Sequence, residues 1–124
     1  MIEIQNLVKK YSTQTVLDIS LLKIPAGQTF GLIGNNGAGK TTLFSCLLDL
    51  IKPTKGKVIN NQVDVSISED WKSFTTAFLD ETFLIGYLMP EEYFYFIGEL
   101  RGLSKQKVDS FMSQFEDFFN GEIL

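Results

Sequence analysis

The chain has 124 residues, enough for one domain, and 44% of them are apolar and 21% charged, as in globular proteins. One cysteine and no histidine exclude a disulfide scaffold, multi-cysteine metal sites and histidine-based catalysis. The first residues lack the pattern of a secretion signal, and the longest apolar run falls far below the ~18 residues that cross a bilayer. We therefore expect a cytosolic chain.

Charge divides the sequence into a basic and an acidic part. Residues 1–57 carry seven lysines and three acidic residues, whereas residues 58–124 carry four basic and twelve acidic residues, which gives net charges of +4 and −8. A basic part suits an anionic ligand, and an acidic part opposes nucleic acid along the whole chain. We expect an anion site in the first part and no nucleic-acid partner.

Apolar residues in the first part alternate in a way that predicts strands with one buried face at residues 1–9 and 16–24. Residues 29–33 are apolar on both faces, which is typical of a strand inside a sheet. After a glycine-rich stretch, helical spacing predicts a helix over residues 42–51, which Pro53 ends. This order of strands and helix indicates an α/β fold.

The pattern becomes helical further along the chain. Residues 56–60 and 75–79 are predicted to be short strands, and residues 69–74 to form one or two helical turns. Pro90, with two acidic residues after it, predicts a helix start, and Gly102 predicts the end of that helix. A helical part therefore follows the α/β part.

A last helix is predicted after Ser104, which is a favourable N-cap residue. Apolar residues of this helix recur at helical spacing and are expected to form a buried stripe. They are Val108, Phe111, Met112, Phe115 and Phe119. Phe118 is expected in the core with them.

The strongest motif is the pattern G-x-x-x-x-G-K-[ST], which is matched at every position by Gly34-Asn35-Asn36-Gly37-Ala38-Gly39-Lys40-Thr41. Glycines let successive backbone N–H groups point into one concave anion site, and the helix that follows adds its positive end. Lys40 can reach terminal phosphates, and the Thr41 hydroxyl can bind a magnesium ion. The sequence therefore predicts a phosphate-binding loop (P-loop) rather than a glycine-rich turn without a ligand.

The residues around this loop resemble those of ATP-binding cassette (ABC) ATPases. The loop is similar to their G-x-N-G-A-G-K-[ST]-T version, Gly27–Gly34 to their lead-in strand, and Thr54–Val58 to the strand after their loop helix. Pro90–Leu103 resembles the start of their helical subdomain, most of all in exporters. The resemblance implies an α/β fold in which a partial P-loop core with N-terminal antiparallel β strands (residues 1–89) precedes the beginning of a helical subdomain (residues 90–124).

The resemblance also implies the ligands and the site. The expected cofactors are ATP and Mg²⁺, with Tyr11 stacking on the adenine, Thr42 at an inner phosphate and Lys40 in a catalytic role. On general grounds Tyr11 could instead be a half-exposed packing residue. The full set of expected cofactor-binding residues is Tyr11, Val16, Asn36, Gly37, Ala38, Gly39, Lys40, Thr41 and Thr42.

Asp80 and Glu81 follow an apolar segment and allow three interpretations. They imitate a Walker B strand, in which Asp holds magnesium and Glu orients water, or they end a strand as two solvated acids. In ABC ATPases this position belongs to the Q-loop, which usually carries Gln, and the helical segment after residue 90 favours this third interpretation. It implies a catalytic and metal-contacting role for Asp80, although Asp is shorter than Gln and charged.

The resemblance implies the ATP-binding subunit of a transporter, which couples ATP hydrolysis to transport in the complete protein. Its expected partners are a transmembrane permease subunit and a second ATP-binding subunit, at the cytoplasmic side of the cell membrane. The signature segment, a distal Walker B strand and the switch histidine of the family are absent, so we expect a truncated chain that is inactive alone. The alternatives are a non-transport ABC-type ATPase, acting in translation or DNA repair, and a nucleotide-binding module without turnover.

Overall fold

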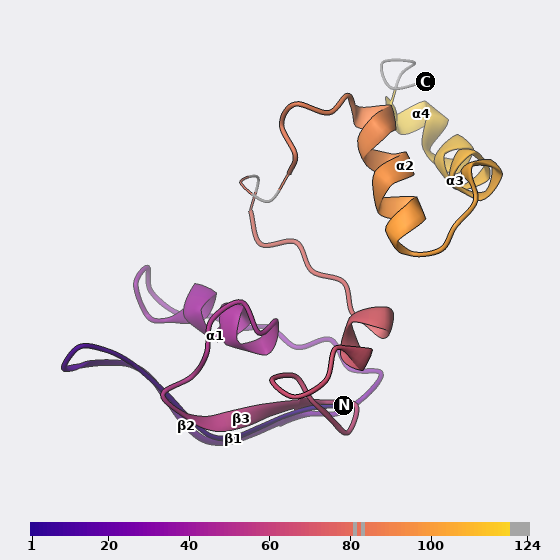
Figure 1. Ribbon diagram of the computed structural model, residues 1–124. Helices are drawn as coiled ribbons and strands as arrows, with labels where there is room; N and C mark the ends of the chain where they lie inside the picture. Colours follow the sequence, from indigo (N-terminus) through magenta and orange to yellow (C-terminus); the bar gives the residue numbers. More distant parts are fainter. Residues whose placement is uncertain (81, 83, 120–124) are drawn as a thin grey trace. The chain divides into compact units, whose positions relative to one another are not determined.

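The computed structural model describes residues 1–80, 82 and 84–119 (Figure 1). Contacts between residues divide the chain into two compact units, Met1–Leu79 and Asp80–Leu124. The first unit combines a sheet with a helix, and the second is helical. The α/β fold class with N-terminal antiparallel strands is confirmed, whereas the predicted domain boundary between residues 89 and 90 stays a prediction.

The sheet of the first unit has four strands in the order β2-β1-β3-β4, and every neighbouring pair is antiparallel. The strands are β1 (Ile2–Tyr11), β2 (Gln14–Ile24), β3 (Lys55–Asn60) and β4 (Val63–Asp64). β1 and β2 form a long hairpin whose register runs from Ile2 opposite Ile24 to Tyr11 opposite Gln14. The three strands predicted at residues 1–9, 16–24 and 56–60 are thus confirmed, with slightly wider bounds.

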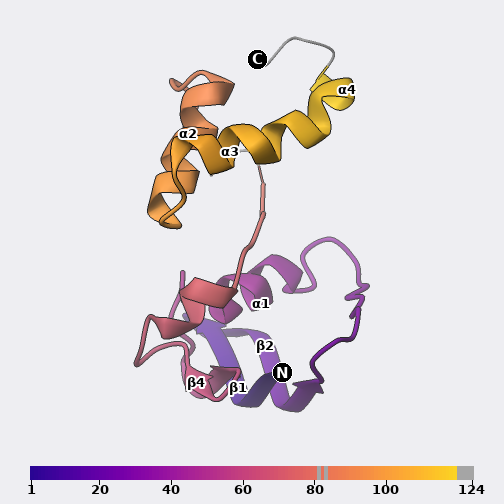
Figure 2. The ribbon, with the colours of Figure 1, turned by 90° about the vertical axis from the view of Figure 1, so that its right-hand side faces the viewer.

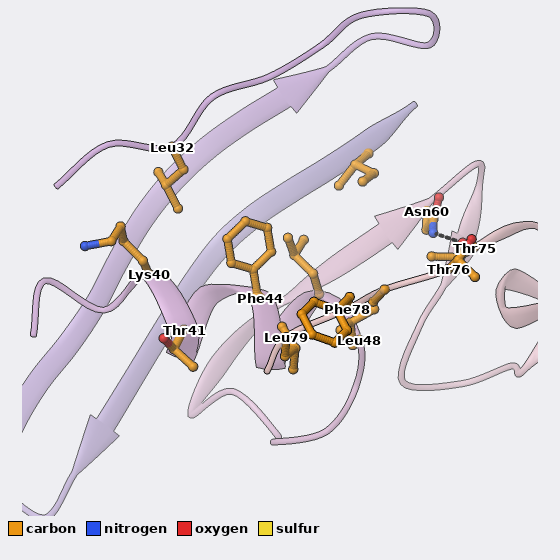
Figure 3. A pocket seen from close by; sticks show the side chains of 13 residues that line it. Leu32, Lys40, Thr41, Phe44, Leu48, Asn60, Thr75, Thr76, Phe78 and Leu79 are labelled. Atoms are coloured by element: carbon orange, nitrogen blue, oxygen red, sulfur yellow. Dashed lines mark hydrogen bonds between the residues drawn. The ribbon is translucent and has the colours of Figure 1, made fainter. Parts of the chain in front are cut away.

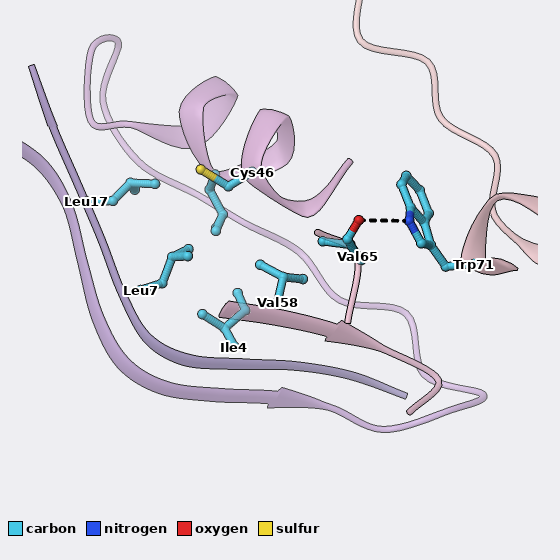
Figure 4. Packing of buried hydrophobic residues seen from close by; sticks show 8 residues of the cluster. Ile4, Leu7, Leu17, Cys46, Val58, Val65 and Trp71 are labelled. Carbon is cyan, nitrogen blue, oxygen red and sulfur yellow. Dashed lines mark hydrogen bonds between the residues drawn. The ribbon is translucent and has the colours of Figure 1, made fainter. Parts of the chain in front are cut away.

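Helix α1 (Lys40–Leu47) covers one face of this sheet, and the core lies between them (Figure 2). The buried residues of the core are Ile4, Leu7, Leu17, Leu43, Cys46, Val58, Val65 and Trp71. Trp71 belongs to the 3-10 helix η1 (Asp70–Phe74), and its indole N–H donates a hydrogen bond to the Val65 carbonyl at 3.2 Å (Figure 4). This bond satisfies the one polar atom of a large buried side chain.

Two of the predicted strands are wrong. Neither residues 29–33 nor residues 75–79 form a strand, and Ile33 and Phe78 are 98% and 72% exposed. Leu32 of the first segment and residues 75–79 line a cavity of about 510 Å³ instead. Apolar composition made these segments suitable for the interior of a sheet, but a strand also requires a hydrogen-bonded neighbour on at least one side. Within the described residues neither segment belongs to the sheet β2-β1-β3-β4.

The second unit contains α2 (Pro90–Leu100), α3 (Lys105–Met112), the 3-10 helix η3 (Ser113–Phe115) and α4 (Glu116–Phe119). As predicted, Pro90 opens α2, and the Ser104 hydroxyl accepts the N-cap hydrogen bond of α3 from the Lys107 N–H. The helices approach most closely at Gly98, where an added Cβ would lie 2.4 Å from Val108 Cγ2. Glycine therefore sets the distance between α2 and α3.

The predicted stripe of α3 is only partly buried. Val108 and Met112 are buried, but Phe111, Phe115 and Phe118 are 58%, 43% and 80% exposed, so their expected place in the core is wrong. Two short helices cannot cover both sides of α3, and the side that faces α2 takes the smaller residues. The side chain of Phe119 lies outside the described part of the structure. Among the described residues, no helix is both long and apolar enough to span a membrane.

Candidate functional site

Two glycines of left-handed backbone conformation shape the P-loop. Gly37 and Gly39 have φ angles of +81° and +87°, a region that other residues rarely adopt. Between them the loop closes a turn, in which the Ala38 N–H donates to the Asn35 carbonyl at 3.1 Å. The Leu43 N–H then donates to the Gly39 carbonyl at 2.8 Å and starts the helical hydrogen-bond ladder of α1.

The first backbone N–H groups of α1 lack an acceptor within the described chain. Lys40, Thr41 and Thr42 donate no backbone hydrogen bond, and no side chain caps the helix. Such N–H groups carry the positive end of the helix dipole and attract anions. The start of α1 therefore presents three converging donors that a phosphate group can satisfy.

A hollow of about 230 Å³ lies in front of these donors. It is lined by Val16, Asn36, Gly37, Gly39, Lys40, Thr41 and Thr42. Its volume is below the roughly 300–1,000 Å³ of pockets that enclose whole small molecules. The hollow therefore suits the phosphate groups of a nucleotide rather than the entire molecule.

The structure brings Val16 from β2 to the loop, and Gly39 makes this possible. A Cβ at Gly39 would lie 2.7 Å from the Val16 carbonyl oxygen and 3.0 Å from Leu17 Cδ2, so only glycine allows the loop to approach β2 this closely. Ala38 does not line the hollow.

The Lys40 side chain folds back over the loop. Its ammonium donates to the carbonyl oxygens of Gly34 at 2.5 Å and Asn35 at 2.7 Å. A lysine ammonium has three donors, so one remains for an oxygen of a ligand. The charged end of the Lys40 side chain therefore lies over the loop.

The donor set at the loop also fits magnesium. Among the described residues, no group of three or more Cys, Asp or Glu side chains gathers into a metal site of its own. Mg²⁺ usually takes only one or two protein ligands and completes its shell with phosphate oxygens and waters. The Thr41 hydroxyl at the edge of the phosphate hollow suits that partial role.

Tyr11 lies at the end of β1 and does not line the phosphate hollow. Its side chain is 52% exposed, and the Lys9 ammonium lies 4.9 Å from the centroid of its ring. Sequence reasoning missed Lys9, although its spacing of two residues from Tyr11 places both on one side of a strand. The stacking role of Tyr11 stays a prediction.

Asp80 is the first residue of the second unit and is exposed. Its carboxylate accepts hydrogen bonds from the Thr82 hydroxyl and from the Thr82 N–H, the latter at 2.8 Å. These bonds lower the pKa of Asp80 from its ordinary value, so the group is ionised at neutral pH. Its catalytic and metal-contacting roles stay predictions, and Glu81 lies outside the described residues.

The larger cavity of the first unit was not foreseen from the sequence. Besides the segments at residues 29–33 and 75–79, it is lined by Lys40, Thr41, Phe44 and Leu48 of α1 and the residues after it (Figure 3). At its rim the Asn60 amide donates to the Thr75 hydroxyl at 2.8 Å. Helix α1, whose first N–H groups face the phosphate-sized hollow, thus has a second, mostly apolar surface.

A glycine-rich loop that places free amides, a lysine and a threonine at the start of a helix defines a P-loop nucleotide-binding protein. The sequence model of the ABC transporter family matches residues 17–119, which is most of the chain. The chain therefore belongs to the ABC transporter family, and the resemblance seen in the sequence is confirmed.

Relatives of established function share part of the sequence. Over 67 residues the chain is 43% identical to the phosphonates import ATP-binding protein PhnC of Chromohalobacter salexigens, a match that covers 53% of this chain and 25% of PhnC. Over 70 residues it is 43% identical to the energy-dependent translational throttle protein EttA of Haemophilus influenzae, which covers 56% of this chain and 13% of EttA. The family thus includes both transport and translation proteins.

Solved structures share the fold. An ATP-binding subunit of an ABC transporter superposes with a TM-score of 0.72 at 24% identity, over 98% of this chain and 51% of that chain. A dimeric ATP-binding cassette in a post-hydrolysis state, bound to ADP and Pi, superposes with a TM-score of 0.71 at 21% identity, over 87% of this chain and 52% of that chain. The chain spans about half the length of these structures.

Proposed function

We propose that this chain is the Mg-ATP-binding part of an ABC transporter subunit, in which ATP hydrolysis drives transport through a membrane partner. The observation that carries the proposal is the set of unsatisfied N–H groups at the start of α1, which open into a hollow of phosphate size. Membership of the ABC transporter family supports ATP as the source of those phosphates.

In this proposal different residues contact different parts of the nucleotide. The amides of Gly37, Gly39 and residues 40–42 hold the phosphates, the Lys40 ammonium neutralises the terminal one, and Thr42 contacts an inner phosphate. Tyr11 and Val16 form the side of the site that receives the base. Neutralising charge at a transferring phosphoryl group is the main contribution that a protein makes to such chemistry.

Magnesium would be held by the Thr41 hydroxyl. When bound, the ion neutralises charge that develops on the phosphate oxygens during transfer. A metal-contacting role for Asp80 rests on the resemblance to ABC ATPases alone.

Residues 1–124 alone are proposed to bind ATP weakly and to hydrolyse it negligibly. Leu103 and Ser104 are followed by Lys105 and Gln106, not by the glycines of a signature segment. The resemblance places hydrolysis at an interface where the signature segment of one subunit covers the nucleotide of another. A turnover near ~1 per second, typical of enzymes, would contradict this proposal.

The proposed partners are a transmembrane permease and a second ATP-binding subunit, at the cytoplasmic side of the membrane. Transport of phosphonates by the PhnC system supports a transport role. The similarity to EttA favours one other candidate, a non-transport ATPase that acts in translation. Co-fractionation with membranes that contain a permease distinguishes the two, because the translation candidate would remain with ribosomes.

The proposal is tested by titrating the chain with Mg-ATP in a calorimeter. Lys40→Ala removes a charge-assisted bond of about 1.5–3 kcal/mol, so ATP affinity should fall about 10- to 100-fold. Lys23→Ala is the matched control, because Lys23 lies on β2 opposite Glu3, at the other end of the hairpin from Tyr11. Equal affinities of the Lys40 and Lys23 variants would contradict the proposal.

A further inference from the structure

We infer that Lys9 is a positioning residue for Tyr11: its ammonium, anchored on the Lys52 carbonyl, holds one face of the Tyr11 ring and leaves the other face for the base of the nucleotide. The inference rests on the proposed function and extends it to a residue outside the phosphate loop.

The geometry links the end of α1 to the Tyr11 ring through a single ammonium group. Lys9 Nζ lies 4.9 Å from the ring centroid, within the ~6 Å at which a cation is attracted to an aromatic face. The same nitrogen donates a hydrogen bond to the Lys52 carbonyl at 2.7 Å. Lys52 follows α1 in the chain, so the ammonium bridges the region after this helix and the end of β1.

The backbone on both sides of Lys9 is fixed by one residue. The Thr54 N–H donates to the Val8 carbonyl at 2.7 Å, and the Lys10 N–H donates to the Thr54 hydroxyl oxygen at 3.0 Å. The Cα of Lys9 and the Lys52 carbonyl oxygen, which accepts the hydrogen bond from its ammonium, are therefore both held in place. Its side chain is partly buried, which further restricts its rotamers.

Tyr11, in contrast, is weakly held. It is the last residue of β1, next to a turn in which Ser12 has a φ angle of +53°, and it is 52% exposed. Within the described part of the chain, Lys9 provides the one charged contact on its ring. Because an immobilised side chain loses less entropy when a ligand stacks on it, holding the ring in advance strengthens base binding.

The contribution of Lys9 should appear only for ligands that carry a base. We would measure the affinities of Mg-ATP and of inorganic triphosphate, and take their ratio, for the wild type and for Lys9→Met, Lys9→Arg and Lys10→Met. Lys9→Met should weaken ATP binding about two- to fivefold and leave triphosphate binding unchanged. Lys9→Arg keeps a cation over the ring and should restore the ratio. Lys10→Met removes the same charge from the neighbouring position and should leave the ratio at its wild-type value.

Three results would overturn the inference. An equal loss for ATP and triphosphate, which leaves their ratio unchanged, would mean that the Lys9 charge acts on the phosphates. An ATP affinity that Lys9→Met does not change would mean that Lys9 does not act on the base. If Tyr11→Ala leaves the ratio unchanged as well, the stacking role itself fails. Failure of the proposed function can be distinguished from failure of the Lys9 inference, because the wild-type chain would then bind neither ATP nor triphosphate. The positioning role of Lys9 would be excluded by the same result.

A measurement without nucleotide tests the same contact. The ring current of Tyr11 should shift the side-chain methylene proton resonances of Lys9 upfield in the wild type, and Tyr11→Leu should return them to ordinary values. Resonances of Lys9 that are identical in both proteins would contradict the contact.

Discussion

Replacing Gly39 by alanine perturbs the contact that places the P-loop against β2. Gly39 has a φ angle of +87°, and a Cβ there would lie 2.7 Å from the backbone oxygen of Val16. Gly37 offers a matched control in the same loop, because its φ angle is +81° and a Cβ there would meet nothing within 4 Å. The two substitutions share the conformational penalty, and only the first adds a steric clash.

The magnitudes separate the two effects. Placing a non-glycine residue in the left-handed region costs about 1–2 kcal/mol, which Gly37→Ala and Gly39→Ala have in common. Alanine also restricts the unfolded chain, but equally in both variants. Forcing a methyl group against a backbone oxygen costs about a further 1–3 kcal/mol. We therefore expect a loss of about 1–2 kcal/mol for Gly37→Ala and about 2–5 kcal/mol for Gly39→Ala.

Urea unfolding followed by the fluorescence of Trp71 provides the assay. Trp71 is the single tryptophan and is 4% exposed in the core of the first unit, so it reports the unfolding of that unit. The difference between the two variants should be at least ~1 kcal/mol, and Gly39→Ala should also weaken ATP binding because the loop must move away from Val16. Equal stabilities of the two variants would refute the steric argument.

Three further predictions concern other parts of the chain. The hydrogen bond from the Tyr95 hydroxyl to the Asp109 carboxylate, at 2.6 Å, raises the pKa of Tyr95 to about 12. The stability that it contributes should be fully present below pH ~10 and lost as pH rises through about 12, and phenolate absorbance should show this late titration. Gly98→Ala should destabilise the second unit, since a clash with Val108 of about 1–3 kcal/mol outweighs a helix-propensity gain of about 1 kcal/mol. Burial raises the pKa of the Cys46 thiol, so it should react with a disulfide reagent at pH ~8 only after unfolding.

Two of these have a control variant, and each has a contrary result. Asp109→Asn should return the Tyr95 titration toward its ordinary range, and a late titration that persists would exclude this bond as the cause. Val108→Ala should remove most of the effect of Gly98→Ala, and a stabilising Gly98→Ala would contradict the close approach of α2 and α3. Immediate reaction of Cys46 in the native chain would show that the core is open.

Local chemistry explains what could be predicted from the sequence. The P-loop is built from glycines at fixed offsets and from a helix that follows directly. The sequence motif is therefore enough to predict the conformation of the loop. The helix starts at Pro90 and Ser104 were found for the same reason, since caps act within one turn. Strands β1 and β2 were found because apolar residues largely alternate along their sequences and the two strands pair through a short turn.

Long-range pairing explains what could not be predicted. The apolar pattern of residues 29–33 is suitable for a central strand, yet whether it pairs depends on segments far along the chain. The exposure of Phe111 and Phe118 likewise depends on how much of α3 its neighbours cover. The link from Lys9 to Tyr11 depends on the Lys52 carbonyl, 43 residues away, which no local pattern indicates.

The most direct measurement is the mapping of Mg-ATP on the backbone amides by NMR of the ¹⁵N-labelled chain. The largest shifts should fall on Gly37, Gly39, Lys40, Thr41 and Thr42, whose N–H groups surround the phosphate hollow, and inorganic triphosphate should shift the same amides. Saturable binding that leaves these amides unmoved, or shifts centred on another element, would contradict the assignment of this loop as the nucleotide-binding site.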